Sequence, residues 1–380
     1  MQPKPFTVSI PDEVLDDLRS RLARTRLPEP LPQPGWTAGV DLGYLKGLLD
    51  HWAVSFDWRA QERRLNSFPQ FTADVDGQTI YFVHQRGRGP RPLPLVLTHG
   101  WPSSFVELLK LAPLLTDPAA YGADEEDSFD VVIPSLPGFA FSGQPERPGA
   151  CTRHNMARLW ARLMTDCLGY PRFGAQGQDI GGAVTVQLAA SRPELVAGVH
   201  LTGILTFPPR DRPLSEEGRA FLARQERWRS LEGAYSSQQG TYPQTLACGL
   251  TDSPAGLAAW IVDKFRAWSD CDGDPEQRFT NDELLTNLTI YWATGSINSS
   301  FLFYYDTLHD PEPPAPVRVE VPVGVALFPK ENPITGPRDW AELTYNVVRW
   351  TEMPRGGHFA AAEEPELLAA ELREFFHPLR

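Results

Sequence analysis

The sequence contains few of the residues that build disulfide frameworks or metal sites. Its 380 residues include only four cysteines, and no two of them have the Cys-x-x-Cys or zinc-finger spacing. Sparse cysteines without such spacing are typical of reduced thiols in a cytoplasmic protein. We therefore expect neither a disulfide nor a metal site at the four positions, which are Cys151, Cys167, Cys248 and Cys271.

The sequence also lacks long hydrophobic runs and an excess of basic charge. No stretch approaches the 18 apolar residues that indicate a membrane span, and the N-terminus has no apolar signal-peptide region. The formal net charge of -13 argues against nucleic acid or an anionic membrane surface as a partner. We expect a soluble, cytoplasmic protein without a membrane anchor that acts on uncharged molecules.

The apolar patterns that are present indicate an α/β fold. Short continuous apolar runs are typical of parallel strands that are covered on both faces. Such runs predict strands at 94–98, 130–134, 199–205, 321–327 and 346–350. A further strand is predicted at 174–178, where the chain leads into a glycine-rich turn. Helical patterns at 151–168 and 365–376 complete the alternation of strands and helices. The segment from 208 to 315 differs, since it is rich in Trp, Tyr and charged helical pattern and contains no buried strand.

These patterns divide the chain into four segments. Residues 1–90 form an N-terminal extension with helices near 14–23 and 42–52 and a hairpin at 71–84 that turns at Asp76-Gly77. We predict the first part of the α/β core at 91–207, an inserted and mostly helical cap at 208–315, and the second part of the core at 316–380. An open α/β sheet places its site at the carboxyl ends of its strands, where such a cap would lie.

The most informative motif is a sharp strand-to-helix turn around Asp179. Gly177 and Gly181 flank Asp179 in the small-x-nucleophile-x-small pattern of a nucleophile elbow. A carboxylate at this tip favours displacement at an sp3 carbon, as in the opening of an epoxide or the expulsion of a halide, and the product is an ester of the enzyme. The pattern alone is weak evidence for a catalytic nucleophile, because an Asp before two glycines is commonly part of an ordinary turn or a helix N-cap.

A base and an acid follow the elbow in the expected places. His358 lies in a Gly-Gly-His turn after the last strand, and Glu331 follows the strand before it. The order nucleophile, acid, base is that of the α/β-hydrolase fold. We predict that His358 activates water and that Glu331 orients its imidazole. Six other histidines lack such a context and are expected to be structural or surface residues: His51, His84, His154, His200, His309 and His377.

The loop after the first buried strand reads His99-Gly100-Trp101-Pro102. In an α/β-hydrolase this loop supplies one backbone N–H to the oxyanion hole, and the residue after the nucleophile supplies another. The candidates are therefore the N–H groups of Trp101 and Ile180. We expect His99 to hold the loop by hydrogen bonds rather than to take part in the chemistry.

Taken together, the His99–Pro102 loop, the Asp179 elbow, Phe328-Pro329-Lys330-Glu331 and Gly356-Gly357-His358-Phe359 resemble the microsomal-type epoxide hydrolases. The resemblance runs from about residue 5 to the C-terminus. It implies an α/β-hydrolase fold with a helical cap and the family's N-terminal domain. The chain looks like a soluble member, because it has no N-terminal anchor helix.

The resemblance further implies two cap tyrosines that hydrogen-bond the epoxide oxygen. The matching residues are Tyr235, in a Gly-Ala-Tyr segment where the family usually has Gly-Tyr, and Tyr304, although adjacent Tyr305 leaves the register open. Ring opening produces an alkoxide, which a phenol stabilises or protonates. Without the resemblance, cap packing with the hydroxyl bonded to backbone is the favoured interpretation of either tyrosine.

The predicted reaction converts an apolar epoxide and water into a vicinal diol without metal or organic cofactor. Two alternatives stay open at this point. A haloalkane-type dehalogenase shares the Asp elbow, but it would be expected to have Trp in place of Ile180. A non-catalytic binder of an apolar ligand would have no need of an intact triad. The N-terminal segment either wraps its own chain or supports a homodimer.

Overall fold

The computed structural model describes residues 2–33, 35–311 and 318–380. In these ranges the strands form one sheet in the order β1-β2-β3-β5-β4-β6-β7-β8-β9. The strands from β5 to β9 are parallel, and β1, β2 and β3 extend them as an antiparallel edge. Their bounds are β1 Lys4–Pro5, β2 Gln70–Val75, β3 Gln78–Gln85, β4 Leu93–Thr98, β5 Phe129–Pro134, β6 Phe173–Gly177, β7 Val196–Leu201, β8 Val319–Leu327 and β9 Tyr345–Glu352.

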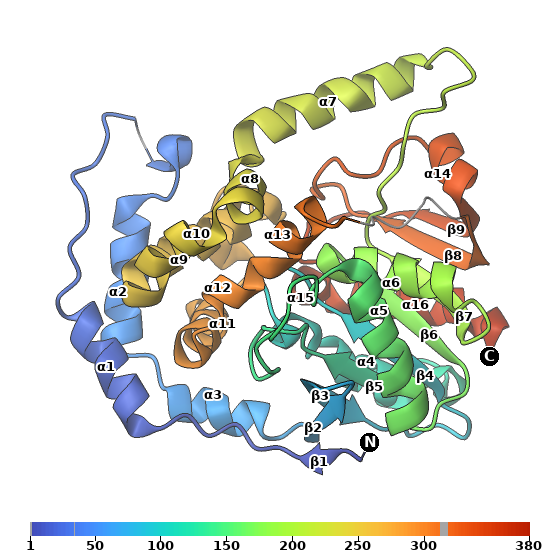
Figure 1. The fold of residues 1–380 in the computed structure, drawn as a ribbon, viewed down its shortest axis with the longest axis horizontal. Helices are drawn as coiled ribbons and strands as arrows, with labels where there is room; N and C mark the ends of the chain where they lie inside the picture. Colours follow the sequence, from blue (N-terminus) through green and yellow to red (C-terminus); the bar gives the residue numbers. More distant parts are fainter. Residues whose placement is uncertain (1, 34, 312–317) are drawn as a thin grey trace.

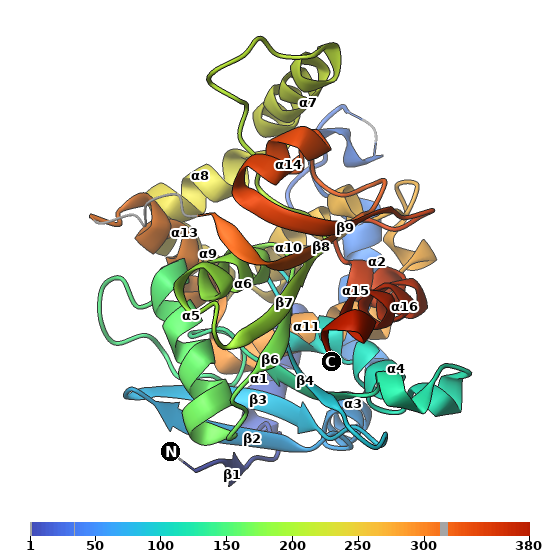
Figure 2. The same ribbon diagram turned by 90° about the vertical axis from the view of Figure 1, so that its right-hand side faces the viewer.

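Helices cover both faces of the parallel part of the sheet, which explains the continuous apolar runs. Helices α5 (Arg153–Arg162) and α6 (Ile180–Ser191) lie on one face, and α4 (Leu111–Thr116) and α16 (Pro365–Phe376) lie on the other (Figure 2). All residues of β5, β6 and β7 are buried. The sequence thus predicted an α/β sheet with two helical layers correctly.

A helical cap lies over the carboxyl ends of the strands (Figure 1). It begins with the long helix α7 (Glu216–Glu232), and within the described part of 208–315 it contains no strand, as predicted. The predicted boundary at 315/316 lies outside the described residues. The other cap helices are α8 Ala234–Thr241, α9 Pro243–Asp252, α10 Pro254–Trp268, α11 Asn281–Thr294, α12 Ile297–Ser300 and α13 Leu302–Leu308.

The N-terminal segment wraps the cap of its own chain. Helices α1 (Asp12–Leu22) and α2 (Leu42–Val54) contact α10 and α11, and α3 (Trp58–Leu65) contacts α11. Two polar contacts fix α2 to α11: Trp52 Nε1 donates to Thr289 Oγ1 at 2.9 Å, and His51 Nε2 lies 2.8 Å from Asp282 Oδ1. Because β1–β3 also extend the sheet, this segment joins the cap to the core.

Several predicted bounds differ from the structure. The strand expected at 199–205 is β7, which ends at Leu201, because the chain turns away at Thr202 and Gly203 to reach the cap. The helix expected at 151–168 begins at Arg153 and continues as a π-helical turn from Leu163 to Cys167. The sequence patterns missed β1, α3, α4, α14 (Arg338–Thr344) and α15 (Ala360–Glu363), all of which are short. No helix in the described ranges combines the length and apolarity that crossing a bilayer requires.

Candidate active site

The predicted elbow is present between β6 and α6, and steric limits explain its small residues. Asp179 has φ 50° and ψ -123°, a conformation that costs energy for a residue with a Cβ. A Cβ at Gly177 would lie 2.2 Å from the carbonyl oxygen of Gly181, and one at Gly181 would lie 2.0 Å from that of Thr98. A Cβ at Gly182 would meet nothing closer than 3.8 Å, so only the first two glycines are sterically required.

The Asp179 carboxylate lies between backbone donors and the imidazole of His358. Trp101 N donates to Oδ1 at 2.9 Å, and Ile180 N also donates to the carboxylate. Oδ2 lies 3.8 Å from His358 Nε2. A Cβ at Gly100 would stand 2.4 Å from Asp179 Oδ1, so glycine is needed where the loop passes the carboxylate. Trp101 N therefore holds Oδ1 of Asp179, and Oδ2 is the oxygen on the side of His358.

His358 and Glu331 meet as the sequence predicted. Glu331 follows β8, His358 follows β9, and Glu331 Oε1 lies 2.7 Å from His358 Nδ1. Burial alone would lower the pKa of His358, but the carboxylates of Glu331, Asp179 and Glu107 outweigh it and raise the pKa to about 9. Burial also raises the pKa of Asp179, an effect that the positive charge of His358 and the two backbone donors oppose. The neighbouring carboxylates thus favour the protonated form of the His358 imidazole.

The loop residues around Trp101 brace this arrangement. His99 is fully buried, and its Nε2 accepts from Leu136 N at 3.3 Å while Nδ1 lies 3.1 Å from the carbonyl oxygen of Gly100. These contacts fix the loop, in line with the structural part expected of His99. Burial lowers the pKa of His99 to about 4, so the ring is neutral. Pro102 follows through a cis peptide bond, and its carbonyl accepts from Asn287 in the cap.

Two of the three candidate tyrosines lie together above the elbow. Tyr235 stacks on Trp101 with ring centroids 5.1 Å apart, and Tyr304 meets Tyr235 edge to face at 5.8 Å. The Tyr304 hydroxyl is buried and interacts with the hydroxyl of Tyr235. Burial and the charge of Asp179 raise the pKa of both tyrosines. Tyr305 instead is exposed and stacks on His309 at 4.1 Å, so the structure brings Tyr304 and not Tyr305 to Tyr235.

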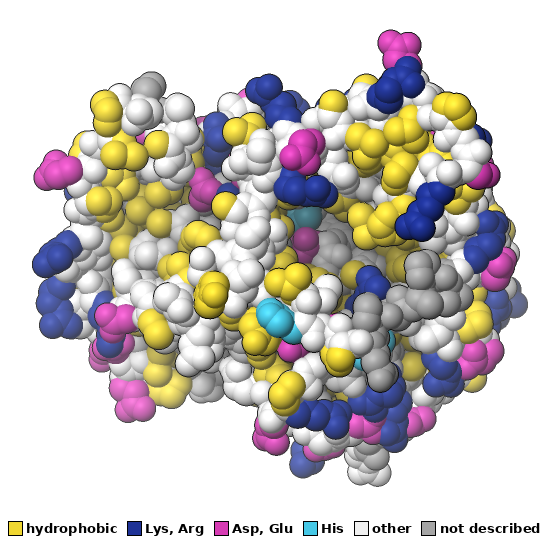
Figure 3. Space-filling view, turned by 45° about the horizontal axis from the view of Figure 1, so that its top comes forward, with side chains coloured by type: hydrophobic (Ala, Val, Ile, Leu, Met, Phe, Trp, Pro, Cys, Tyr) yellow, Lys and Arg dark blue, Asp and Glu magenta, His cyan; other side chains and the backbone are white. Residues whose placement is uncertain are grey.

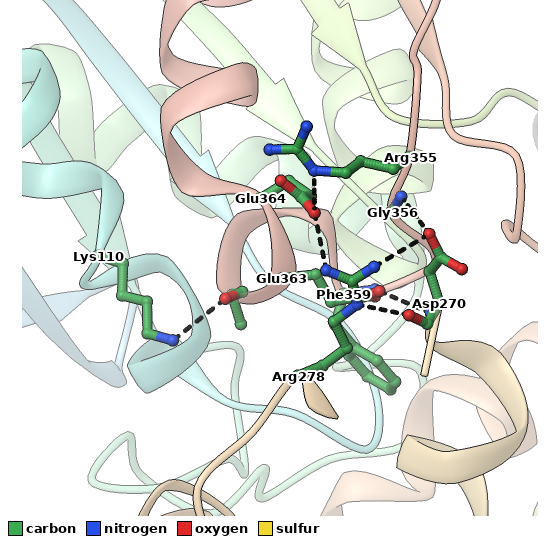
Figure 4. Close-up of polar contacts among 9 residues, drawn as sticks. Lys110, Asp270, Arg278, Arg355, Gly356, Phe359, Glu363 and Glu364 are labelled. Atoms are coloured by element: carbon green, nitrogen blue, oxygen red, sulfur yellow. Dashed lines mark hydrogen bonds and ion pairs between the residues drawn. The ribbon is translucent and has the colours of Figure 1, made fainter. Parts of the chain in front are cut away.

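Sequence reasoning missed the contacts that hold the His358 loop to the cap. Glu363 Oε1 accepts from Phe359 N at 2.9 Å, and its Oε2 accepts from Asp270 N at 2.7 Å (Figure 4). Arg278 Nη1 in turn lies 3.0 Å from Glu364 Oε1. The carbonyl of Trp268 accepts from His358 N at 2.9 Å. No sequence motif marks these residues, because the contacts join segments some 90 positions apart, such as Asp270 and Glu363 at a separation of 93.

The comparisons with known proteins agree with this geometry. The family described as "Epoxide hydrolase N terminus" matches residues 3–108, and "alpha/beta hydrolase fold" matches residues 94–239. The chain is 38% identical over 411 residues to "Epoxide hydrolase 1" of Oryctolagus cuniculus, covering 98% of this chain and 88% of that protein. The chain belongs to the epoxide hydrolase family.

Solved structures of this family confirm the fold. The epoxide hydrolase of Aspergillus niger superposes with a TM-score of 0.87 at 33% identity, covering 100% of this chain and 97% of that one. The juvenile hormone epoxide hydrolase of the silkworm Bombyx mori superposes with a TM-score of 0.91 at 29% identity, covering 100% and 95%. This chain is therefore an epoxide hydrolase with an α/β-hydrolase core, the family's N-terminal segment and a helical cap, and the dehalogenase and non-catalytic alternatives fall away.

Proposed function

We propose that this epoxide hydrolase opens apolar epoxides through an ester on Asp179. The observation that carries the proposal is that the two oxygens of the Asp179 carboxylate have different surroundings. Trp101 N holds Oδ1 at 2.9 Å, and Oδ2 remains free to attack, 3.8 Å from His358 Nε2. Attack by Oδ2 on an epoxide carbon breaks the carbon–oxygen bond of the ring and leaves an alkoxide.

Tyr235 and Tyr304 are the proposed partners of that alkoxide. Both keep their protons at neutral pH, because burial raises the pKa of each phenol above its ordinary value. A protonated phenol donates to the epoxide oxygen before ring opening and supplies a proton as the alkoxide forms. The buried hydroxyls of Tyr235 and Tyr304 interact with each other, which supports a shared role in binding one incoming acceptor.

His358, oriented by Glu331, is the proposed base of the second step. Formation of the ester removes the negative charge of Asp179, one of the charges that raise the pKa of His358. The imidazolium gives its proton to the tyrosinate that ring opening left, and the neutral imidazole then takes a proton from water. The resulting hydroxide attacks the ester carbonyl, and the N–H groups of Trp101 and Ile180 stabilise the oxyanion on the former Oδ1. The products are the diol and the free carboxylate.

Aromatic and apolar surface supports an uncharged, apolar substrate. Trp101 and Trp268 pack around Tyr235, with centroids 5.1 Å and 4.9 Å from its ring. Figure 3 shows a hollow in which a histidine and an acidic side chain are visible, with hydrophobic side chains beside it and charged side chains above it. Exposed apolar residues such as Leu205 and Phe207 precede α7. We propose that the epoxide enters on this face.

Two further points stay proposals. The segment bounds 1–90, 91–207, 208–315 and 316–380 follow the changes in sequence character described above. A cytoplasmic location is supported by four free cysteines and by the acidic composition.

Product analysis tests the reaction. The enzyme is incubated with aryl, terminal and disubstituted epoxides and with matched haloalkanes, and the products are identified by mass spectrometry. We expect diols from the epoxides and no halide from the haloalkanes. Halide release without diol would contradict the proposal, and Tyr235 and Tyr304 would then be packing residues.

A further inference from the structure

A cavity lies between the N-terminal segment, the core and the cap. Its volume is about 70 Å³, and its walls come from α3, the 3-10 helix Phe105–Leu108, α10, α11 and α15. One ordered water needs about 10–15 Å³ on this scale, so the cavity has room for several. The described residues that line it include none of the five proposed catalytic side chains, but they do include Glu107.

Glu107 carries an oxygen that the protein leaves unsatisfied. The side chain is only 5% exposed, and its Oε1 accepts from Gln178 Nε2. Glu107 Oε2 and Gln178 Oε1 are both buried without a partner among the described residues. Buried polar oxygens are almost always hydrogen-bonded, either to protein or to ordered water. Glu107 lines the cavity, which can therefore offer its Oε2 such a water.

The same carboxyl interacts electrostatically with the reacting groups. Gln178, its partner, directly precedes Asp179 in the elbow. Burial is the largest influence on the pKa of Glu107 and brings it to about 7; the Ser103 hydroxyl and the positive charge of His358 oppose this rise, and the charge of Asp179 adds to it. Glu107 in turn contributes to the raised pKa of His358. Water held by Glu107 would thus stand close to the base and the ester that the second step requires.

The outer end of the cavity is polar. Lys110 Nζ lies 2.7 Å from Glu283 Oε1 and donates to the carbonyl of Ala362 at 3.1 Å, and both charged side chains are partly exposed. Lys110 extends from the core towards the helix that carries Glu363 (Figure 4). The walls of the cavity are mostly apolar, with Leu65, Leu109 and Phe265 among them, so water would be held at its polar groups, which are Glu107 and the Lys110–Glu283 ion pair.

We propose that this cavity supplies the water of the hydrolysis step and that the Glu107 carboxyl positions one water beside His358 and the Asp179 ester. The assignment rests on the proposed function, in which Asp179 forms the ester and His358 activates water. Substrate and water then reach the site from different sides, and Glu107 is a positioning residue for the second half-reaction alone.

Single-turnover kinetics on two variants test this assignment, with ester formation and ester decay measured separately by rapid quench and mass spectrometry. Glu107→Gln keeps an oxygen that accepts from Gln178, so the elbow stays braced. Ala362→Leu fills the cavity from α15. For both variants we expect ester decay to slow by about tenfold or more, with ester formation changed by less than about twofold. Ala259→Leu is the matched control, since Ala259 is also a half-buried helical alanine but does not line the cavity, and both steps should stay at the wild-type rate.

The outcomes separate this assignment from the function on which it rests. Equal slowing of both steps in Glu107→Gln would show a purely structural brace and overturn the assignment. Unchanged ester decay in either variant would also overturn it. A wild-type enzyme that forms diol without an ester on Asp179 would instead refute the proposed mechanism. Thermal melting of each variant shows whether the fold is retained.

Discussion

Asp179, Glu331 and His358 stand at strand ends of the sheet, whereas Tyr235 and Tyr304 come from two helices of the cap. The sheet fixes its groups through the backbone: Gly100 and Gly181 leave no space for a Cβ, and Asp179 is held at a positive φ. The cap fixes its groups through contacts between large rings. Substitutions at the strand ends therefore disturb the catalytic groups directly. Substitutions in the cap can alter the shape of the pocket while the hydroxyls of Tyr235 and Tyr304 stay in place.

The largest effect is expected where the sheet presents the nucleophile. Asp179→Ala removes the group that forms the ester, and we expect turnover to fall by at least about a thousandfold. Steady-state diol formation measures this loss. Because burial disfavours the ionised carboxylate, the variant should melt no earlier than the wild type. An active Asp179→Ala enzyme would show that the elbow is not the site of chemistry.

A smaller loss is expected on the cap side. Tyr304→Phe removes one donor to the developing alkoxide while Tyr235 remains, so ester formation should slow by roughly a hundredfold. Tyr305→Phe is the matched control, since that ring stacks on His309 at the surface. Pre-steady-state ester formation distinguishes the two. Equal losses in both variants would mean that the hydroxyl of Tyr304 has no specific role.

The steric limits of the elbow predict a stability difference between neighbouring glycines. In Gly181→Ala the new Cβ would press on the Thr98 carbonyl, and we expect a loss of about 1–3 kcal/mol in the free energy of unfolding. Gly182→Ala has space and lies in a helix, so it should gain up to about 1 kcal/mol. Urea unfolding measures the free energy of unfolding of both variants. Equal values would show that the start of α6 shifts to make room for the Cβ at position 181.

A still smaller effect concerns pH. The pKa of His358 is raised to about 9 in the resting enzyme, partly by Asp179. The ester lacks that charge, so ester decay should rise with pH around a midpoint below 9. Nuclear magnetic resonance titration of His358 gives the resting value, and single-turnover decay gives the value in the ester. Identical midpoints would show that the charge of Asp179 has no influence on the base.

The comparison also explains how far the sequence was predictive. The elbow and the His358 turn could be predicted from the sequence because both motifs are local in sequence. Steric limits at the strand ends also allow few residue types there. The choice between Tyr304 and Tyr305 was not readable, since it depends on which face of α13 meets Trp101. Glu107 and Glu363 were missed because their roles depend on burial and on contacts between distant segments.

The most direct test of the central claim is to trap the ester. His358→Gln removes the base of the second step and leaves the nucleophile intact, so incubation with an epoxide should add the mass of one epoxide to the protein, and peptide mapping should locate it on Asp179. A His358→Gln enzyme that carries no adduct and releases diol at the normal rate would contradict the account.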